Sequence, residues 1–242
     1  MPLPNTVSPP VAYFDVQTGY VNISSSVFSV VDQISGLAAS QTVVANQPTF
    51  SAVALTNLLG GLSFAGITFG GSAFLSFNRL ATLLSGSGSN SFTLMVVASC
   101  SAPASSTQSL LAFGNSGSNT TTELFVNASN VGVIDRNDAG TSVTASDSTV
   151  LDTKAHVYTV INNLATGIIT VNKDGVQDFT LSGAGGVHTY NTFTIGGRAN
   201  NGSTLELFNG TIGSVVAWFG AADYTLVEDY MLNRYLNTDL EG

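Results

Sequence analysis

Short apolar stretches with a two-residue period recur along the chain and are separated by residues typical of turns. In residues 92–99 (FTLMVVAS), every second residue from Phe92 to Ala98 is apolar and shares one face of an extended strand. Such alternation predicts a strand that is buried on at least one side. The same period returns in residues 156–162, 168–172 and 213–219. The pattern therefore predicts an all-β protein.

The clearest turn lies between two of these stretches. Asp174-Gly175 separates the strand pattern of residues 168–172 from a second alternating run that follows it. An Asp-Gly pair accepts the positive φ angles that a two-residue β-turn requires. The sequence therefore predicts a β-hairpin centred on Asp174 and Gly175.

One helix is predicted, near the end of the chain in residues 223–236 (DYTLVEDYMLNRYL). Thr225 can cap its first turn, and Glu228, three residues later, can return the hydrogen bond. An apolar stripe at helical spacing would pack on the predicted strands. The stripe consists of Leu226, Val227, Tyr230, Met231 and Tyr235.

Residues 29–50 (SVVDQISGLAASQTVVANQPTF) admit three interpretations: a catalytic loop, a ligand loop, or a corner between strands. The corner is favoured because Asp32 and Ser35 can bond to backbone groups of a turn, and Gly36 can adopt a conformation that other residues avoid. The Ser/Gly tract of residues 83–91 is interpreted as a surface loop.

Composition limits the surface and the partners. The chain has 242 residues, of which 44% are hydrophobic and only 9% charged, with a formal net charge of −9. Its length suits a single sandwich domain, and its surface must consist mainly of Ser, Thr, Asn, Gln and Gly. Such a surface is less costly to desolvate than a charged one, which favours self-association or a place in a larger assembly. Six basic residues are too few for nucleic acid to be a partner.

No residue suggests an export or membrane segment. The N-terminal MPLPNTVSPP lacks the basic start and the apolar core of a signal peptide, and no stretch reaches the roughly 20 apolar residues of a membrane helix. We therefore expect synthesis in the cytoplasm and no membrane insertion. The single cysteine, Cys100, is interpreted as a buried thiol, because neither His156 nor His188 is close to it in sequence.

This order of elements resembles the concanavalin A-like lectin/glucanase sandwiches, in particular the laminin G-like jelly-roll domains of phage and bacterial surface proteins. The resemblance begins with Val31–Gly36 (VDQISG), followed by Gln41 and the Gln47-Pro48 pair. It continues through residues 62–77 (LSFAGITFGGSAFLSF), similar to paired strands around a Gly turn, and through the strand at 92–99. Residues 193–236 carry the strongest likeness, to the strand-and-helix closure of that family.

The resemblance implies a two-sheet antiparallel jelly-roll sandwich with one C-terminal helix. Residues 1–10 would form an extended proline-rich arm, and residues 11–242 a single domain. Trp218, in an apolar strand, would lie in the core beneath the helix.

Catalysis is not expected. Hydrolases on this sandwich carry carboxylates on one strand face in an ExDxE pattern, and no such triplet occurs here. Glu123 and Glu206 stand in strand-like runs with no second carboxylate two or four residues away. A lone carboxylate on a strand usually faces solvent, so neither residue is assigned a catalytic role.

Two candidate sites remain, each with a structural alternative. Asp135, Asn137 and Asp138, with Asp147 further on, could ligate calcium at the sandwich rim, or could form a turn rich in Asp and Asn. Apart from this calcium ion, no cofactor is expected. An aromatic platform with polar neighbours could bind a sugar, although Asn-rich loops are common. The candidate sugar-binding residues are His188, Tyr190, Arg198, Asn200 and Asn201.

Two functions from different classes are compatible with these features. The first is a non-enzymatic virion structural protein, such as a bacteriophage capsid decoration, head-fibre or tail component, located on the particle with other virion proteins. The second is a carbohydrate-binding module or adhesin that recognises cell-surface glycans. In the first, Leu3 and Val7 of the N-terminal arm would dock on a neighbouring chain; in the alternative, the arm folds back on its own domain.

Overall fold

A computed structural model describes residues 9–17, 20–23, 26–56, 63–86, 91–101, 106–128, 130–147, 152–200, 203–220 and 224–235. The first strands are β1 (Ala12–Asp15), β2 (Tyr20–Ile23), β3 (Ser26–Val31), β4 (Ala38–Ser40), β5 (Thr49–Thr56), β6 (Ser63–Gly70) and β7 (Leu75–Ser76). The central strands are β8 (Phe92–Cys100), β9 (Gln108–Gly114), β10 (Thr121–Val126), β11 (Val131–Arg136), β12 (Ser142–Ser146) and β13 (His156–Asn163). The last are β14 (Ile168–Lys173), β15 (Val176–Ser182), β16 (Thr192–Ile195), β17 (Arg198–Asn200), β18 (Ser203–Leu205) and β19 (Asn209–Phe219).

The helices are the 3₁₀ turn η1 (Val44–Asn46), α1 (Asn78–Gly86) and α2 (Thr225–Tyr235). None of the described helices is long and apolar enough to cross a membrane. The proline-rich arm, with Leu3 and Val7, lies outside the described residues apart from its last two positions.

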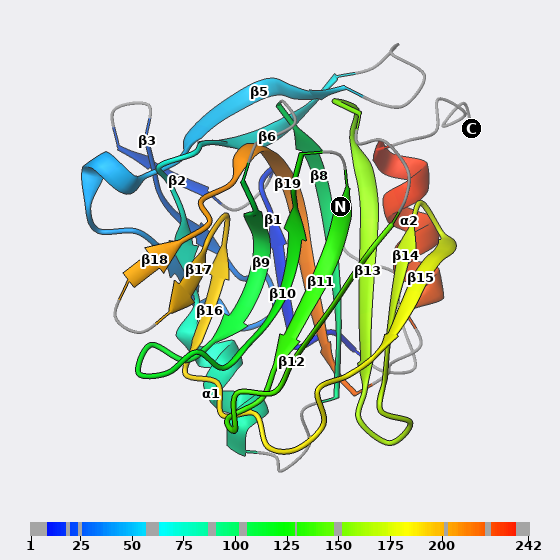
Figure 1. Ribbon diagram of the computed structural model, residues 1–242. Helices are drawn as coiled ribbons and strands as arrows, with labels where there is room; N and C mark the ends of the chain where they lie inside the picture. The colour runs from blue at the N-terminus through cyan, green and yellow to red at the C-terminus, as the bar shows by residue number, and fades with distance from the viewer. Residues whose placement is uncertain are drawn as a thin grey trace.

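The strands form an antiparallel sandwich of two layers. One layer has the order β5, β6, β19, β8, β13, β14 and β15, with β1 also paired to β19. The other has the order β4, β7, β16, β9, β10, β11 and β12. Strand β3 joins them at one edge, because it pairs with both β4 and β5. Figure 1 shows β9–β12 overlying β8 and β19. The predicted jelly-roll sandwich is confirmed.

The core lies between the layers, as the two-residue period requires. Phe92, Leu94 and Val96 of β8 face Leu111 and Phe113 of β9 across a continuous apolar cluster. Burial of these side chains stabilises the fold, since each large apolar side chain removed from water contributes about 1.5–3 kcal/mol. The inner face of β8 is the one that the sequence pattern indicated.

Helix α2 covers the outer face of the first layer, where Val227 and Met231 pack on Met95 and Trp218. The core position predicted for Trp218 is thus confirmed. Arg234 ties the helix to β1 through an ion pair with Asp15, at 3.2 Å. An arginine that spans two elements in this way fixes the angle of the helix on the sheet.

Two details of α2 differ from the sequence prediction. The Glu228 side chain accepts a hydrogen bond from Thr159 Oγ1 of β13, at 2.5 Å, so it is used to dock the helix on the sheet. Leu226 is 53% exposed and does not join the apolar stripe. Tertiary packing thus selected a narrower stripe than the helical period alone suggested.

The corner prediction for residues 31–36 is confirmed. Asp32 accepts hydrogen bonds from the backbone N–H groups of Ile34 and Ser35 and, from β1, of Tyr13. Gly36 has a φ of 71°, in the region that only glycine enters without strain. The predicted Asp174-Gly175 turn is also present, with both residues at positive φ.

Two local predictions are wrong. Residues 62–77 were expected to contain strands paired around a glycine turn, yet β6 pairs with β5 and β19, whereas β7 pairs with β16 and β4. The surface-loop prediction for residues 83–91 is wrong for residues 83–86, which lie in helix α1, and residues 87–90 fall outside the described residues. This second helix forms because Leu80, Ala81 and Leu84 recur at helical spacing and pack into the core.

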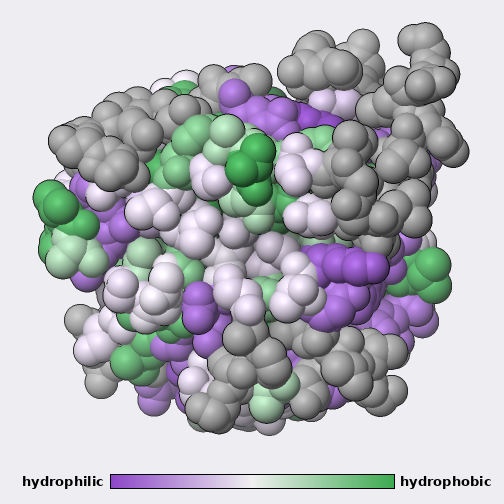
Figure 2. Space-filling view, turned by 90° about the horizontal axis from the view of Figure 1, so that it is seen from above, coloured by the Kyte–Doolittle hydropathy of each residue, from purple (hydrophilic) through white to green (hydrophobic). Residues whose placement is uncertain are grey.

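The outer surface agrees with the expectation of few charges. Figure 2 views one end of the sandwich, where much of the described surface is pale, the colour of intermediate hydropathy. Ser, Thr and Gly have such values, and they are abundant in this chain.

Candidate functional site

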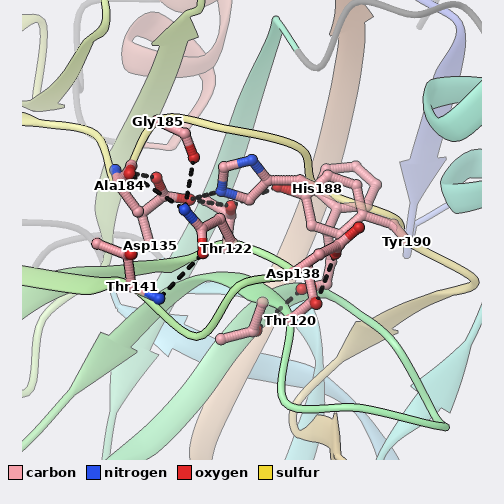
Figure 3. Close-up of polar contacts among 12 residues, drawn as sticks. Thr120, Thr122, Asp135, Asp138, Thr141, Ala184, Gly185, His188 and Tyr190 are labelled. Atoms are coloured by element: carbon pink, nitrogen blue, oxygen red, sulfur yellow. Dashed lines mark hydrogen bonds and ion pairs between the residues drawn. The ribbon is translucent and has the colours of Figure 1, made fainter.

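Asp135 lies at the end of β11, on the face that looks into the sandwich, and is 2% exposed. Thr122 Oγ1 donates to its Oδ1 at 2.6 Å, and the Ala184 N–H donates to its Oδ2 at 2.7 Å. His188 Nε2 lies 3.1 Å from Oδ1. Figure 3 shows how these groups converge from β10, β11 and the loop of residues 183–191. This carboxylate therefore holds the loop against the end of the sheet.

The environment of Asp135 favours its charged form. Burial raises the pKa of Asp135, but hydrogen bonds from His188, Thr122 and the Ala184 backbone outweigh burial, so the pKa lies below its ordinary value. The carboxylate stays ionised at neutral pH because the surrounding donors compensate the lost water.

Asn137 and Asp138 serve the same loop. The Asn137 Nδ2 amide donates to the Gly185 carbonyl at 2.9 Å, and the Thr141 N–H donates to its Oδ1. Asp138 accepts from the hydroxyls of Thr120 and Thr189, both at 2.7 Å, as drawn in Figure 3. We call this set of contacts, centred on Asp135, Asn137 and Asp138, the loop clasp.

The loop clasp contains the three residues predicted to ligate calcium. Their oxygens face N–H and O–H donors, whereas a bound cation requires free lone pairs. Within the described residues, no group of three His, Cys, Asp or Glu side chains is arranged to hold a metal ion. Calcium binding here stays a prediction that requires these donors to turn away.

The described residues predicted to bind sugar do not form one site: the rings of His188 and Tyr190 are in contact, with centroids 5.8 Å apart, but Arg198 lies elsewhere. Tyr190 is 1% exposed, contacts Thr122 Oγ1 through its hydroxyl at 2.6 Å, and packs on the Phe113 ring. His188 is likewise buried in the loop clasp. Arg198 lies on β17, on the opposite side of the same layer. The Asn200 side chain and Asn201 fall outside the described residues.

Arg198 binds two carboxyl groups on the outer face of the second layer. Its Nη2 lies 3.0 Å from Glu206 Oε1, and its Nη1 lies 3.4 Å from Glu123 Oε2. Glu123 comes from β10, whereas Arg198 and Glu206 come from the β17–β18 hairpin and the residue after it. The hairpin therefore brings a cation and an anion to a carboxyl group on the sheet.

Glu123 lies in an environment that disfavours charge. Its side chain is completely buried, and the groups that favour its charged form are few: the Arg198 guanidinium at 3.4 Å and the Ser109 hydroxyl. Burial, followed by the negative charge of Glu206, raises the pKa of Glu123 well above its usual value, with Arg198 opposing the shift. When both carboxyl groups are ionised neither can donate to the other, and a proton on Glu123 supplies the missing donor.

The hairpin is packed tightly on the sheet. A Cβ atom on Gly114 of β9 would lie 2.7 Å from the Ala199 carbonyl oxygen, so only glycine allows this approach. The Ser109 N–H donates to the Glu206 carbonyl at 2.6 Å. Glu206 itself has a φ of 53°, which is uncommon for a residue with a side chain. This backbone turn directs the chain from β18 back towards the sheet.

Beside the hairpin, the outer face of β11 and β12 is partly open to solvent, since Ile134 and Arg136 are half-buried and Thr144 is exposed. Glu123 is the cross-strand partner of Ile134, which in turn pairs with Thr144. Arg136 pairs with Thr121 and is thus a diagonal neighbour of Glu123 on the same face. We call this surface the hairpin-flanked face: Glu123, Ile134, Arg136, Thr144, Arg198 and Glu206.

Sequence reasoning did not find this arrangement, because it looked for carboxylates spaced along one strand. The two glutamates are 83 positions apart, which is the difference between 206 and 123. From the sequence, both side chains are expected to face solvent. Instead, Glu123 is fully buried and the side chain of Glu206 is only 24% exposed. The available signal was the spacing of Arg198 and Glu206 around the Asn-Gly pair at 201–202, typical of a hairpin.

Cys100 is buried at the end of β8, and burial raises the pKa of its thiol to about 12. The thiol therefore stays protonated at neutral pH and is not a nucleophile. His156, on the strand paired with β8, contacts Asp174 through Nδ1 at 2.6 Å and Asp152 through Nε2 at 2.8 Å. The interpretation of Cys100 as a structural thiol agrees with this geometry.

No protein-family model matches the sequence, and no curated protein does so. Solved structures do match the fold. Domain 4 of AbnA, a GH43 extracellular arabinanase from Geobacillus stearothermophilus in complex with arabinotriose, is 14% identical with a TM-score of 0.60, over 92% of this chain and 98% of that domain.

The CBM40 domain of the Ruminococcus gnavus IT-sialidase is 14% identical with a TM-score of 0.57, over 71% of this chain and 97% of that one. The NanB sialidase of Streptococcus pneumoniae is 19% identical with a TM-score of 0.54, over 67% of this chain but only 26% of that one. The present chain thus spans about a quarter of the NanB length. These likenesses establish a jelly-roll sandwich of the concanavalin A-like type, the fold of these carbohydrate-binding domains.

Proposed function

We propose that the protein is a carbohydrate-binding module and that the hairpin-flanked face binds the glycan. Two of its structural neighbours have carbohydrate ligands, arabinotriose for the arabinanase domain and α2,3-sialyllactose for the R. gnavus CBM40. The observation that carries the proposal for this chain is the set of incompletely paired polar groups at the surface of the hairpin-flanked face. Arg136 Nε, Arg198 Nε and Glu206 Oε2 have no hydrogen-bond partner among the described residues, and the side chain of Glu206 is 24% exposed.

Such groups matter because unsatisfied buried polar atoms cost about 1–3 kcal/mol each. Folded proteins retain them mainly where a ligand, ion or water completes the network. The adjoining open surface is polar and nearly free of aliphatic bulk, with Thr144 exposed and Ile134 half-buried. A sugar presents hydroxyl groups that both donate and accept, so it matches mixed carboxyl, guanidinium and hydroxyl partners.

The proposal includes the absence of catalysis. In glycoside hydrolases the two carboxyl groups flank the scissile bond, at separations of about 5 Å or more. Here Glu123 is sealed beneath the hairpin, where a sugar ring has no room between it and Arg198. Incubation with arabinan, β-glucans, alginate and agar should release no reducing ends above background. Turnover that disappears in Glu123→Gln or Glu206→Gln would contradict this part of the proposal.

A steric block tests the assignment of the face. Thr144→Trp places a bulky side chain on the exposed surface beside Ile134 without touching a buried residue. The indole ring would push the bound sugar away from the face. Because hydrogen bonds are lost when donor and acceptor separate by about 1 Å, we expect binding to the best ligand from a glycan array to weaken at least about tenfold. Isothermal titration calorimetry measures the change.

Thr180→Trp is the matched control. Thr180 is exposed on β15, in the other layer, so the same substitution there should leave affinity unchanged. Equal binding by wild type and Thr144→Trp would exclude this face. If a broad array gave no reproducible binding at all, the carbohydrate-binding function itself would be wrong.

The virion role, with docking by Leu3 and Val7, self-association and a particle location, stays a prediction from the sequence. Its test is a mass-spectrometric inventory of purified particles. Absence of the chain from every particle preparation would reject it, whereas its presence would be compatible with a glycan-binding module displayed on a particle.

A further inference from the structure

The basic residues of this acidic chain are unevenly placed. The protein has only six, against 15 acidic residues. Four are spread over other parts of the fold: Arg79 in α1, Lys154 before β13, Lys173 at the end of β14 and Arg234 in α2. The remaining two, Arg136 and Arg198, lie on either side of Glu123 on the hairpin-flanked face.

The local charge of this face is less negative than that of the whole molecule. Glu123 is completely buried, and burial together with the negative charge of Glu206 raises its pKa well above the usual value, so its charged form is disfavoured. Arg198 and Arg136 carry one positive charge each, so the two guanidinium groups at least balance the two carboxyl groups of this face, whereas the chain has a net charge of −9. At physiological salt, charges farther away than about 8 Å are largely screened. A ligand at this face therefore responds mainly to the two arginines.

On the hairpin-flanked face, Arg136 is the arginine whose guanidinium still has N–H donors available for a ligand. In the described part of the chain, ion pairs reach Arg198 and Arg234 but not Arg136. Its Nε is buried and has no hydrogen-bond partner among those residues. A guanidinium presents five N–H donors in a planar fork, which fits two oxygens of one anionic group. The missing partner of Arg136 is thus an oxygen acceptor, and an anionic one would also balance the charge.

We propose that this face selects glycans that carry an anionic substituent, a carboxylate or a sulfate, and that Arg136 binds that substituent. The inference rests on the proposed carbohydrate-binding function and specifies its ligand class. Arg198 has a supporting role, because its guanidinium is already shared between Glu206 and Glu123 and holds the hairpin beside the bound sugar.

Matched sugars test the inference. Titration calorimetry compares lactose with 3′-sialyllactose, which adds a carboxylate, and with 3′-sulfolactose, which adds a sulfate. We expect at least one anionic sugar to bind about tenfold or more tightly than lactose, and the two arms identify which substituent is preferred. Raising the salt concentration should reduce this preference, since the pair is partly exposed to solvent.

Variants assign the effect to one side chain. Arg136→Ala should abolish the preference and leave residual affinity close to that for lactose. Arg136→Lys keeps the charge without the planar fork and should retain only part of it. Arg79→Ala removes an exposed arginine of α1 and is the matched control, with no expected change. Thermal unfolding verifies that each variant is folded. If Arg136→Ala does not fold, the binding preference of Arg136→Lys tests the proposal.

The failure of this inference is distinct from that of the function on which it rests. Lactose or arabinotriose binding as tightly as both anionic sugars would overturn the anion preference while leaving a carbohydrate-binding module. A preference that persists unchanged in both Arg136 variants would overturn the assignment to Arg136. Silence of all neutral and anionic glycans would reject the carbohydrate-binding function together with this inference.

Discussion

Asp135 and Glu123 lie on adjacent strands of one layer and are almost equally buried, yet the structure treats their charges in opposite ways. Asp135 faces inward and receives hydrogen bonds from Thr122 and the Ala184 backbone, so its pKa is lowered despite burial. Glu123 faces outward beneath the hairpin, where burial and the negative charge of Glu206 outweigh Arg198 and the Ser109 hydroxyl, so its pKa is raised. Burial alone therefore does not set the charge state; the hydrogen-bond donors and the charges around the carboxyl group decide it.

The largest expected change in stability follows from substitution of Asp135, the carboxylate that is surrounded by hydrogen-bond donors. Asp135→Asn replaces an acceptor oxygen by an NH₂ group that would face the Ala184 N–H or the Thr122 hydroxyl. We expect the free energy of unfolding at pH 7 to fall by about 3 kcal/mol, since charge-assisted hydrogen bonds contribute about 1.5–3 kcal/mol each. Urea denaturation measures it, with Asp229→Asn on the exposed side of α2 as control.

The pH dependence of the same variant provides a second measurement. Because the folded-state pKa of Asp135 is lowered, its stabilisation is fully present above the unfolded pKa of about 3.9 and is lost as pH falls through the folded value. The difference between wild type and Asp135→Asn should thus shrink below pH 4. A loss under 1 kcal/mol at pH 7 would mean that the loop clasp does not depend on this charge.

Gly114 tests whether the hairpin creates the dry environment of Glu123. In Gly114→Ala the new methyl group would meet the Ala199 carbonyl, so the β17–β18 hairpin must lift from the sheet. We expect a destabilisation of about 2 kcal/mol, in the range found for overpacking. We also expect the pKa of Glu123 to fall towards its ordinary value as water enters. Carboxyl titration by NMR reports the second effect, and an unchanged pKa would mean that strand packing alone buries Glu123.

The smallest expected change in stability is at Glu123, where the substitution should stabilise the protein and not destabilise it. A raised folded-state pKa means that the folded protein holds a proton that the unfolded chain releases, so stability declines as pH rises from about 4.5 towards the folded value. Glu123→Gln mimics the protonated form. It should stabilise the protein by about 1 kcal/mol at pH 8, because one pKa unit corresponds to 1.36 kcal/mol.

The Gln variant should differ little from wild type near pH 4, where Glu123 is protonated in both the folded and the unfolded state. Glu228→Gln is a suitable comparison, since burial also raises the pKa of Glu228 but Thr159 donates to it. Destabilisation by Glu123→Gln at pH 8 would show that Glu123 is needed as an anion beside Arg198, and the contrast with Asp135 would fail.

The sequence was sufficient for features that depend on near neighbours. The alternation in β8, the Asp174-Gly175 turn and the corner at Asp32 each arise within about ten residues, so periodicity and turn chemistry predict them. Helix α1 was missed because its apolar spacing is short and merges with a Ser/Gly tract. The pairing of β6 and β7 was misjudged because both are continuous in sequence but belong to different layers.

The candidate site depends on distant residues, and this explains its partial prediction. The sequence pointed to Arg198, but not to its partners, because Glu123 reaches it only after β9 and β10 have paired and the hairpin has folded over them. Asp135 and His188 were each selected, for different roles, and proved to be in contact. No local pattern reports a contact across 53 positions, the difference between 188 and 135.

Strand β19 has a kinetic consequence for synthesis of the chain. It pairs with β8 along its length and with β1 and β6 on its other side, so residues 12–15 find their partners only about 200 positions later. Folding rates fall as such sequence separations grow, because the loop must close before the contacts stabilise it. A ribosome adding 5–20 residues per second takes roughly 10–40 s to reach β19. Until β19 is synthesised, β8 has only β13 as a possible neighbour in the sheet, so chaperone protection of this apolar strand would raise the yield of folded protein.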